Sequence, residues 1–155
     1  MSEAQQPLFS IEKIYVKDLS LEVPGGPQTF MQPEQPQLEV QLAQKSQRLN
    51  DVLFEVTLVI TVSAKRGDKT LFLVEVSQAG VFQIRNVPEA ELAPVLGMVC
   101  PNVLFPYARE TVSDIVNRAG FPPILLAPVN FEALYQQRSA EASAQPGGPR
   151  VEIAH

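Results

Sequence analysis

The sequence predicts an α+β fold in which an antiparallel β-sheet carries helices on one of its faces. Two observations lead to this prediction. The first half of the chain contains segments in which apolar and polar residues alternate, as in strands, and the helix signals all come afterwards. The 155 residues are 45% hydrophobic and 19% charged, with no internal repeat and no long linker, so we expect one folded domain.

The first predicted strand spans residues 14–22, with the sequence IYVKDLSLE. Successive side chains of a strand point to opposite faces of the sheet. Simple alternation therefore gives this strand an apolar face and an acidic face, with Tyr15, Leu19 and Leu21 on one and Asp18, Ser20 and Glu22 on the other.

Three further strands follow. Residues 38–43 predict a half-buried strand. A glycine-containing turn joins the strand at 52–64 to an antiparallel partner at 70–78, where Leu71 and Leu73 make a second face partly apolar, so we expect cover on both sides. The strand at 52–64 has the most regular alternation, with these residues inward: Val52, Phe54, Val56, Leu58, Ile60 and Val62.

Three helices are predicted in the second half. Pro88 suits the first turn of a helix that Pro94 keeps short. A longer helix has Pro106 near its start and Gly120 as its stop, and a final helix begins with Asn130 as its N-cap.

Both ends of the chain have the composition of tails. Residues 1–8 are largely polar, and residues 145–155 contain the stretch QPGGP. We expect both segments to be disordered, and a single folded domain to span residues 9–144.

Composition argues against several classes of function. The net charge of −5 makes a grip on nucleic acid or anionic lipid unfavourable and favours a basic partner. The lone Cys100 excludes an intramolecular disulfide and a cysteine zinc site, and the sole histidine is His155 at the chain end. Nucleotide-binding loops are absent, and no apolar stretch is long enough to span a bilayer. We therefore expect a cytoplasmic protein that is not an enzyme, with no cofactor, no metal and no membrane insertion.

A carboxylate pair can serve as an acid and a base, so the spacing of Asp18 and Glu22 was compared with that requirement. Four residues along a strand separate them by roughly 13 Å, beyond the span of about 5–10 Å that glycosidases use. The geometry disfavours catalysis. The spacing alone favours a solvated face of the sheet.

Four stretches resemble one known family. IYVKDLSLEVP at 14–24, QAGVFQI at 78–84, CPNVLFPYARE at 100–110 and FPPILLAPVNFEALY at 121–135 are similar, in this order, to the bacterial protein-export chaperone SecB. The resemblance runs from about residue 9 to residue 135. It implies a four-stranded antiparallel sheet with C-terminal helices packed on one face, and a homotetramer built as a dimer of dimers. It also implies an ATP-independent holdase that keeps preproteins unfolded and delivers them to SecA.

The resemblance assigns three sets of residues. Each has a plainer alternative, namely ordinary packing or a solvated sheet face. The set implied to bind SecA is Asp18, Glu22, Leu73 and Glu75. The set implied to line the groove for unfolded chains is Phe30, Leu38, Val40, Leu42 and Tyr135. The set implied to lie at the oligomer interface is Val74, Val76 and Gln78.

Two other functions stay open at this point. A SecB-like chaperone can be dedicated to one partner, such as an antitoxin, but such a protein has no need of an acidic SecA-binding face. A carrier or enzyme for a small ligand is the second alternative, and the sequence offers few polar groups that would converge in an apolar groove.

Overall fold

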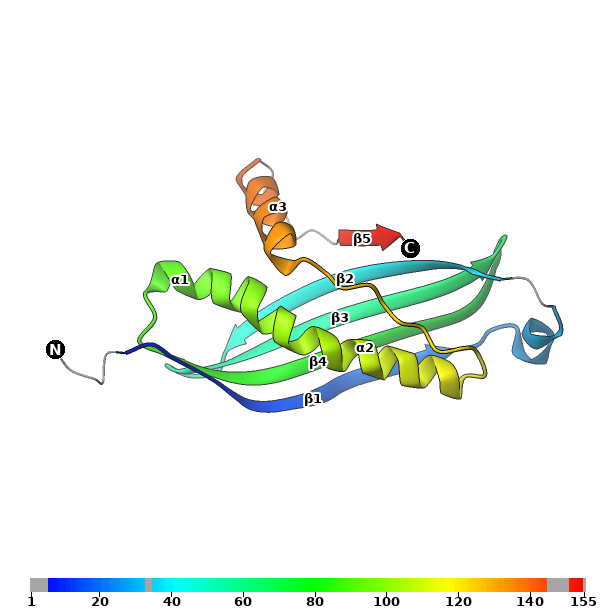
Figure 1. The fold of residues 1–155 in the computed structure, drawn as a ribbon, viewed down its shortest axis with the longest axis horizontal. Coiled ribbons are helices and arrows are strands. Elements are labelled where there is room, and N and C mark those ends of the chain that lie inside the picture. Colours follow the sequence, from blue (N-terminus) through cyan, green and yellow to red (C-terminus); the bar gives the residue numbers. More distant parts are fainter. Residues whose placement is uncertain (1–5, 33–34, 145–150, 155) are drawn as a thin grey trace.

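The computed structural model describes residues 6–32, 35–144 and 151–154 (Figure 1). Its antiparallel sheet has the strand order β1-β4-β3-β2-β5, so the four predicted strands are joined by a short fifth strand at one edge. The strands are β1 (Leu8–Glu22), β2 (Gln37–Arg48), β3 (Leu53–Arg66), β4 (Lys69–Arg85) and β5 (Val151–Ala154). The helical elements are η2 (Gly26–Met31), α1 (Glu89–Pro94), η3 (Val95–Val99), α2 (Cys100–Arg118) and α3 (Phe131–Ala144).

The core lies between the sheet and α2, which runs along one face of it (Figure 1). Gly80 on β4 makes close packing possible, because a Cβ atom there would lie 3.1 Å from Leu104 on α2. The predicted α+β fold, with helices on one face of an antiparallel sheet, is confirmed. Side chains exposed by no more than 2% on this face of β3 are Phe54, Val56, Leu58, Ile60, Val62 and Ala64, and those fully buried on α2 are Cys100, Leu104, Ala108, Val112 and Val116.

The predicted short first helix is confirmed, because α1 ends at Pro94, but the chain does not leave its helical path there. Elements α1, η3 and α2 follow one another without a break, and the turn around η3 is a π-helix in which the N–H of Cys100 donates to the carbonyl of Val95. Pro101 has no N–H for the carbonyl four residues before it, that of Gly97. That carbonyl instead accepts a hydrogen bond of 2.9 Å from the side chain of Gln44 on β2. The wider turn and a donor from the sheet therefore let the helix continue past its prolines.

The predicted faces of β1 also need correction. Val16 pairs with Gln78 and Asp18 pairs with Ser77, so Lys17 is an extra residue in a β-bulge. A bulge resets the alternation of a strand. Tyr15 therefore shares the face of Asp18, away from α2, and not the face of Leu19 as simple alternation predicts.

The ends of the folded region differ from the predicted tails. β1 begins at Leu8, within the predicted N-terminal tail, and residues 1–5 lie outside the described residues. In the predicted C-terminal tail, β5 pairs with β2, while residues 145–150 and 155 lie outside the described residues. Among the described residues, no helix is both long enough and apolar enough to cross a membrane.

Candidate functional site

The face of the sheet that points away from α2, here called the open face, brings together the four residues predicted to bind SecA. Glu22 pairs with Leu73 across β1 and β4, and Ser20 pairs with Glu75. Directly opposite residues in such a pair have Cβ atoms about 4.5–5.5 Å apart. We call this surface the docking patch; it consists of Asp18, Glu22, Leu73 and Glu75.

The docking patch combines exposed charge with a partly apolar centre. Asp18 and Glu22 are exposed, while Leu73 and Glu75 are half-buried. Glu75 accepts a hydrogen bond of 3.0 Å from the hydroxyl of Thr61 on β3, which orients its carboxylate. Glu22 and Glu75 flank Leu73, and Asp18 lies further along β1 on the same face. This arrangement gives a surface that attracts a basic partner and still offers apolar area for contact.

A polar network that the sequence analysis missed lies on the same face. The hydroxyl of Tyr15 donates a hydrogen bond to Glu55, and the ammonium of Lys17 lies 2.8 Å from the same carboxylate. Tyr15 is opposite Ala79 in the β1–β4 pairing, and Ala79 is opposite Thr57 in the β3–β4 pairing. The network therefore spans three strands. The bulge at Lys17 brings Tyr15 to this face, and simple alternation of residues gives no sign of it.

The network shifts two pKa values. The hydrogen bond from Tyr15 to Glu55, with smaller effects of burial and of the negative charge, raises the pKa of Tyr15 to about 12. Hydrogen bonds from Lys17 and then from Tyr15 lower the pKa of Glu55 below its ordinary value. The network thus joins a carboxylate, an ammonium and a phenol, whereas every charged residue of the docking patch is acidic.

The groove residues on β2 lie in the core of this structure. Val40 is 3% exposed and Leu42 is 2% exposed, and Leu38 is partly buried against the same cluster. Segment 121–130 passes over β2 and β3, and its Leu126 belongs to the core as well (Figure 1). Core packing thus accounts for these β2 residues, and their contact with a bound chain stays a prediction.

Phe30 and Tyr135 lie on different parts of the molecule. Phe30 in η2 is 51% exposed, and its ring centroid is 5.1 Å from that of Phe121, at the far end of α2. Tyr135 on α3 packs instead against Gly97, where a Cβ atom would lie only 2.5 Å from the ring. The structure therefore does not gather the predicted groove residues into one pocket.

Tyr135 borders a pocket of about 390 Å³ that lies between α3, the helical segments α1 and η3, and β2. Asn130 caps α3 as predicted, accepting a hydrogen bond of 3.0 Å from the N–H of Ala133, and so fixes where Tyr135 lies. The pocket's apolar lining comes from Ala93, Leu96, Gly97, Tyr135 and Ala142, and its polar lining from Gln44, Lys45, Ser46, Arg138 and Ser139.

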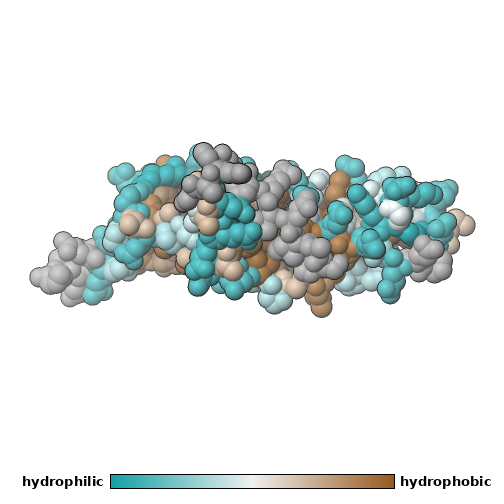
Figure 2. Space-filling view, turned by 90° about the horizontal axis from the view of Figure 1, so that it is seen from above, coloured by the Kyte–Doolittle hydropathy of each residue, from teal (hydrophilic) through white to brown (hydrophobic). Residues whose placement is uncertain are grey.

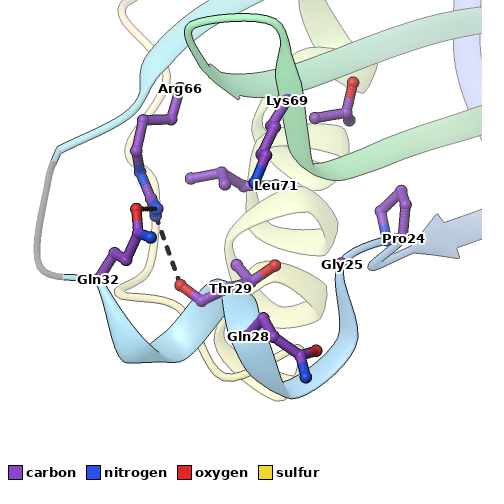
Figure 3. Close-up of a pocket in the computed structure, with 9 residues that line it drawn as sticks. Pro24, Gly25, Gln28, Thr29, Gln32, Arg66, Lys69 and Leu71 are labelled. Carbon is purple, nitrogen blue, oxygen red and sulfur yellow. Dashed lines mark hydrogen bonds between the residues drawn. The ribbon is translucent and has the colours of Figure 1, made fainter.

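A second pocket, of about 520 Å³, lies where η2 meets the β3–β4 hairpin (Figure 3). Arg66 extends across it and donates hydrogen bonds to the side chain of Gln32 at 2.9 Å and to the carbonyl of Thr29 at 3.4 Å. Lys69 also lines the pocket, as does the buried Leu71. The lining includes two basic side chains and does not include Phe30, so this pocket is not the apolar groove that the sequence predicts around Phe30.

Comparison with known proteins identifies the family. The family model described as preprotein translocase subunit SecB matches residues 2–142. The chain belongs to the SecB family. It is 65% identical over 147 residues to the protein-export protein SecB of Chromobacterium violaceum, covering 93% of this chain and 98% of that protein. The corresponding protein of Nitrosospira multiformis is 59% identical over 156 residues, with 99% and 98% covered.

A solved structure shares the fold. A SecB-like chaperone of Mycobacterium tuberculosis, determined in complex with a peptide from an antitoxin, has a TM-score of 0.63 and 17% sequence identity. The match covers 78% of this chain and 90% of that one. The SecB family comprises protein-export chaperones, and this chain has both its sequence pattern and its fold.

The residues assigned to the oligomer interface do not lie on the surface of this SecB-family subunit. Val74 and Val76 are fully buried beneath α2, and Gln78 is 3% exposed, with its amide donating to the carbonyl of Tyr15 at 3.2 Å. Core packing accounts for these three residues within one subunit, and their role in assembly stays a prediction. An exposed set, here called the β1 apolar row, lies on the α2 side of β1 and consists of Phe9, Ile11, Val16 and Leu19.

The structure shows little chemistry beyond binding in the part of the chain that it describes. Burial raises the pKa of the Cys100 thiol to about 12, which keeps it protonated at neutral pH. Among the residues described, no three His, Cys, Asp or Glu side chains cluster closely enough to hold a metal ion.

Proposed function

We propose that this SecB-family protein is an ATP-independent holdase of the cytoplasm, which binds unfolded preproteins and delivers them to SecA through the docking patch. The observation that carries the proposal is the strand register that joins Asp18, Glu22, Leu73 and Glu75 on the open face. The role is one of binding, so it requires neither catalysis nor a cofactor.

Large exposed apolar side chains support binding to unfolded chains. Phe30 and Met31 in η2 are 51% and 77% exposed, and Leu125 is 85% exposed. Unfolded preproteins expose apolar segments that folded proteins bury, so such side chains select for the unfolded state. Burial of about 500 Å² of apolar surface contributes roughly 12 kcal/mol, but ordering about seven residues costs on the order of 10 kcal/mol. A single contact is therefore weak.

Assembly into a homotetramer, a dimer of dimers, would strengthen such weak contacts. Several sites on one assembly bind a long chain with avidity. The β1 apolar row supports assembly, because its four side chains are 39–46% exposed along an edge strand of 15 residues. Light scattering of the purified protein at micromolar concentration should give the mass of a tetramer, and a monomer mass would contradict this part of the proposal.

Docking of SecA is tested by reversing charge. Asp18→Lys together with Glu22→Lys should abolish SecA binding in a calorimetric titration, because like charges at an interface cost several kcal/mol. Folding and capture of unfolded chains should stay nearly unchanged, since both residues are exposed. The matched control, Glu89→Lys with Glu91→Lys on α1, makes the same change in net charge on exposed residues away from the patch. Equal affinity of the two variants for SecA would mean that the docking patch is only a solvated face of the sheet.

Export is favoured over a role dedicated to a single partner. The relatives at 65% and 59% identity are protein-export proteins, whereas the antitoxin-bound chaperone is 17% identical and shows the fold alone. A pull-down from cytosol distinguishes the two roles. The proposal expects many unfolded precursors together with SecA, and a dedicated chaperone would capture one protein without SecA.

A further inference from the structure

The turn η3, between α1 and α2, is the part of the subunit on which α3 rests. None of its five residues is buried, whereas Leu92 before it and Cys100 after it are. Within the described residues, α3 contacts η3 more than any other element. Figure 1 shows α3 standing beyond β2, off the sheet. The position of η3 therefore determines where α3 lies.

Gln44 fixes η3 to the sheet. Its side-chain amide donates a hydrogen bond of 2.9 Å to the carbonyl of Gly97, in the middle of the turn. Pro101, four residues further on, lacks the N–H that would otherwise serve this carbonyl. A part-buried carbonyl without a donor is unfavourable, so we expect the turn to shift if Gln44 is replaced by an apolar residue. Gln44 thus holds η3 where no buried side chain does.

Gly97 also sets how closely α3 approaches. A Cβ atom at this position would lie 2.5 Å from the ring of Tyr135 on α3. Carbon atoms in contact are normally about 3.5–4.0 Å apart. Gly97→Ala would therefore move the ring, and α3 with it, outward by about 1 Å.

The same two residues line the pocket of about 390 Å³ between α3 and β2. Gln44 belongs to the β2 wall and Tyr135 to the α3 wall, and Gly97 contacts both. Figure 2 looks onto this side of the molecule and shows hydrophobic surface between hydrophilic residues. A change at Gln44 or Gly97 therefore alters the distance between the two walls.

We propose that Gln44 and Gly97 are positioning residues that set the width of this pocket and so determine which apolar side chains of an unfolded chain it accepts. Gly97 gives the closest approach of α3, and Gln44 keeps the turn that carries α3 against β2. The inference rests on the proposed binding of unfolded chains. It concerns the size of the side chain that fits, because apolar pockets discriminate between groups that differ by a single methylene.

Peptide affinities test the inference with the assembled full-length chain. The probes are two short, extended, apolar fluorescent peptides, identical except that the central residue is alanine in one and tryptophan in the other. The size preference is the ratio of the two affinities, and a variant that is merely less stable lowers both affinities alike. The variants are Gly97→Ala and Gln44→Met, which keeps the length of the side chain and removes its donor.

Two controls match these changes. Gln47→Met makes the same substitution on the same strand, at an exposed residue of the open face. Asn117→Ala raises helix propensity, as Gly97→Ala does, at an exposed position near the end of α2. Both controls should keep the size preference of the parent.

Gly97→Ala should raise the preference for the tryptophan peptide about three- to tenfold, because the walls lie farther apart. Gln44→Met should raise it by a smaller factor of about three, since η3 is no longer held against β2. Adding Pro101→Ala to Gln44→Met should restore the preference of the parent, because residue 101 then has an N–H for the carbonyl of Gly97. Pro101→Ala alone, which leaves Gln44 in place, is the reference for this double variant.

An unchanged ratio in Gly97→Ala or in Gln44→Met would overturn the inference, as would a control that shifts the ratio as much. Failure of Pro101→Ala to restore the ratio would show that Gln44 does not act through the carbonyl of Gly97, which also overturns it. Failure of the parent chain to bind either peptide would instead contradict the proposed holdase function, on which the inference rests.

Discussion

The two faces of the sheet differ in how deeply their side chains are buried. On β3, Ile60 and Val62 are fully buried beneath α2, whereas Thr61 and Ser63, their neighbours in the chain, lie half-buried on the open face. The same backbone supplies both faces, because successive side chains of a strand point in opposite directions. The covered face holds the core, whereas the open face keeps several side chains partly exposed to solvent.

β4 shows the same division within the residues predicted to be functional. Val74 and Val76 are fully buried, while Leu73 and Glu75 between them belong to the docking patch. A substitution at Val76 acts through the stability of the subunit, and any effect on assembly follows from that. A substitution at Glu75 can act on a partner directly.

The largest effect is expected on the covered face. Ile60→Ala should lower the free energy of unfolding by about 2–5 kcal/mol, because it leaves a cavity under α2. Ser63→Ala, on the open face of the same strand, should change it by no more than about 0.5 kcal/mol. Urea denaturation of both variants measures this. Similar losses of unfolding free energy at the two positions would contradict the proposed difference between the two faces of the sheet.

A second pair of neighbours extends the comparison to segment 121–130. Leu126 is 6% exposed and Leu125 is 85% exposed. Leu126→Ser should cost about 2–3 kcal/mol of stability, since it empties a nearly buried site. Leu125→Ser should leave stability within about 0.5 kcal/mol but weaken capture of an unfolded protein, as measured by suppression of its aggregation. Full capture by the Leu125 variant would exclude that residue from the client surface.

Much of the sheet was predictable from the sequence because period-two alternation over 52–64 is nearly unbroken, and its inward residues from Phe54 to Val62 are buried, although Val52 lies before β3 and is half-buried. The cap at Asn130 was predictable for a similar reason, since the signal is local to a few residues. The joining of Glu22 to Leu73 was not derivable from alternation, because strand register depends on pairing between distant segments. The residues of the docking patch were assigned from the family resemblance instead.

The features that the sequence pattern missed share a physical cause. The bulge at Lys17 and the continuation of the helical path beyond Pro94 both depend on tertiary contacts that a local pattern does not contain. Gln44, for example, satisfies the carbonyl of Gly97 from another element. The role of Val76 in assembly stays a prediction, and the sequence pattern alone did not show that this residue is fully buried within one subunit.

A smaller effect is expected from neutral changes within the docking patch. Leu73→Ala with Glu75→Gln should weaken SecA binding about tenfold, through lost apolar contact and one lost charge. Ser77→Ala, also on the open face and opposite Asp18, is the control and should bind as the parent does. Titrations at rising salt should show the parent weakening, because exposed charges are screened over about 8–10 Å at physiological ionic strength. Salt-independent binding would argue against an electrostatic docking surface.

The smallest effect concerns the network that adjoins the docking patch. Tyr15→Phe removes the hydrogen bond to Glu55 and leaves the ion pair of Glu55 with Lys17. Because the network is largely open to water, we expect a loss of less than about 1 kcal/mol in the free energy of unfolding. SecA binding should be unchanged, since no member of the docking patch is altered.

The pH dependence of stability distinguishes this loss from a packing effect. The folded-state pKa of Tyr15 is raised from 10.0 to about 12, so its stabilising contribution is present below pH 10 and is lost as the pH rises from there through about 12. The pKa of Glu55 is lowered, so its contribution is present above its ordinary value of 4.5 and is lost as the pH falls through the folded-state value. Tyr15→Phe should abolish the alkaline loss that belongs to this residue and only reduce the acid one, because Lys17 is the larger cause of the shift at Glu55. Denaturation midpoints measured against pH test both, and an alkaline profile identical to that of the parent would show that the hydrogen bond adds nothing to the fold.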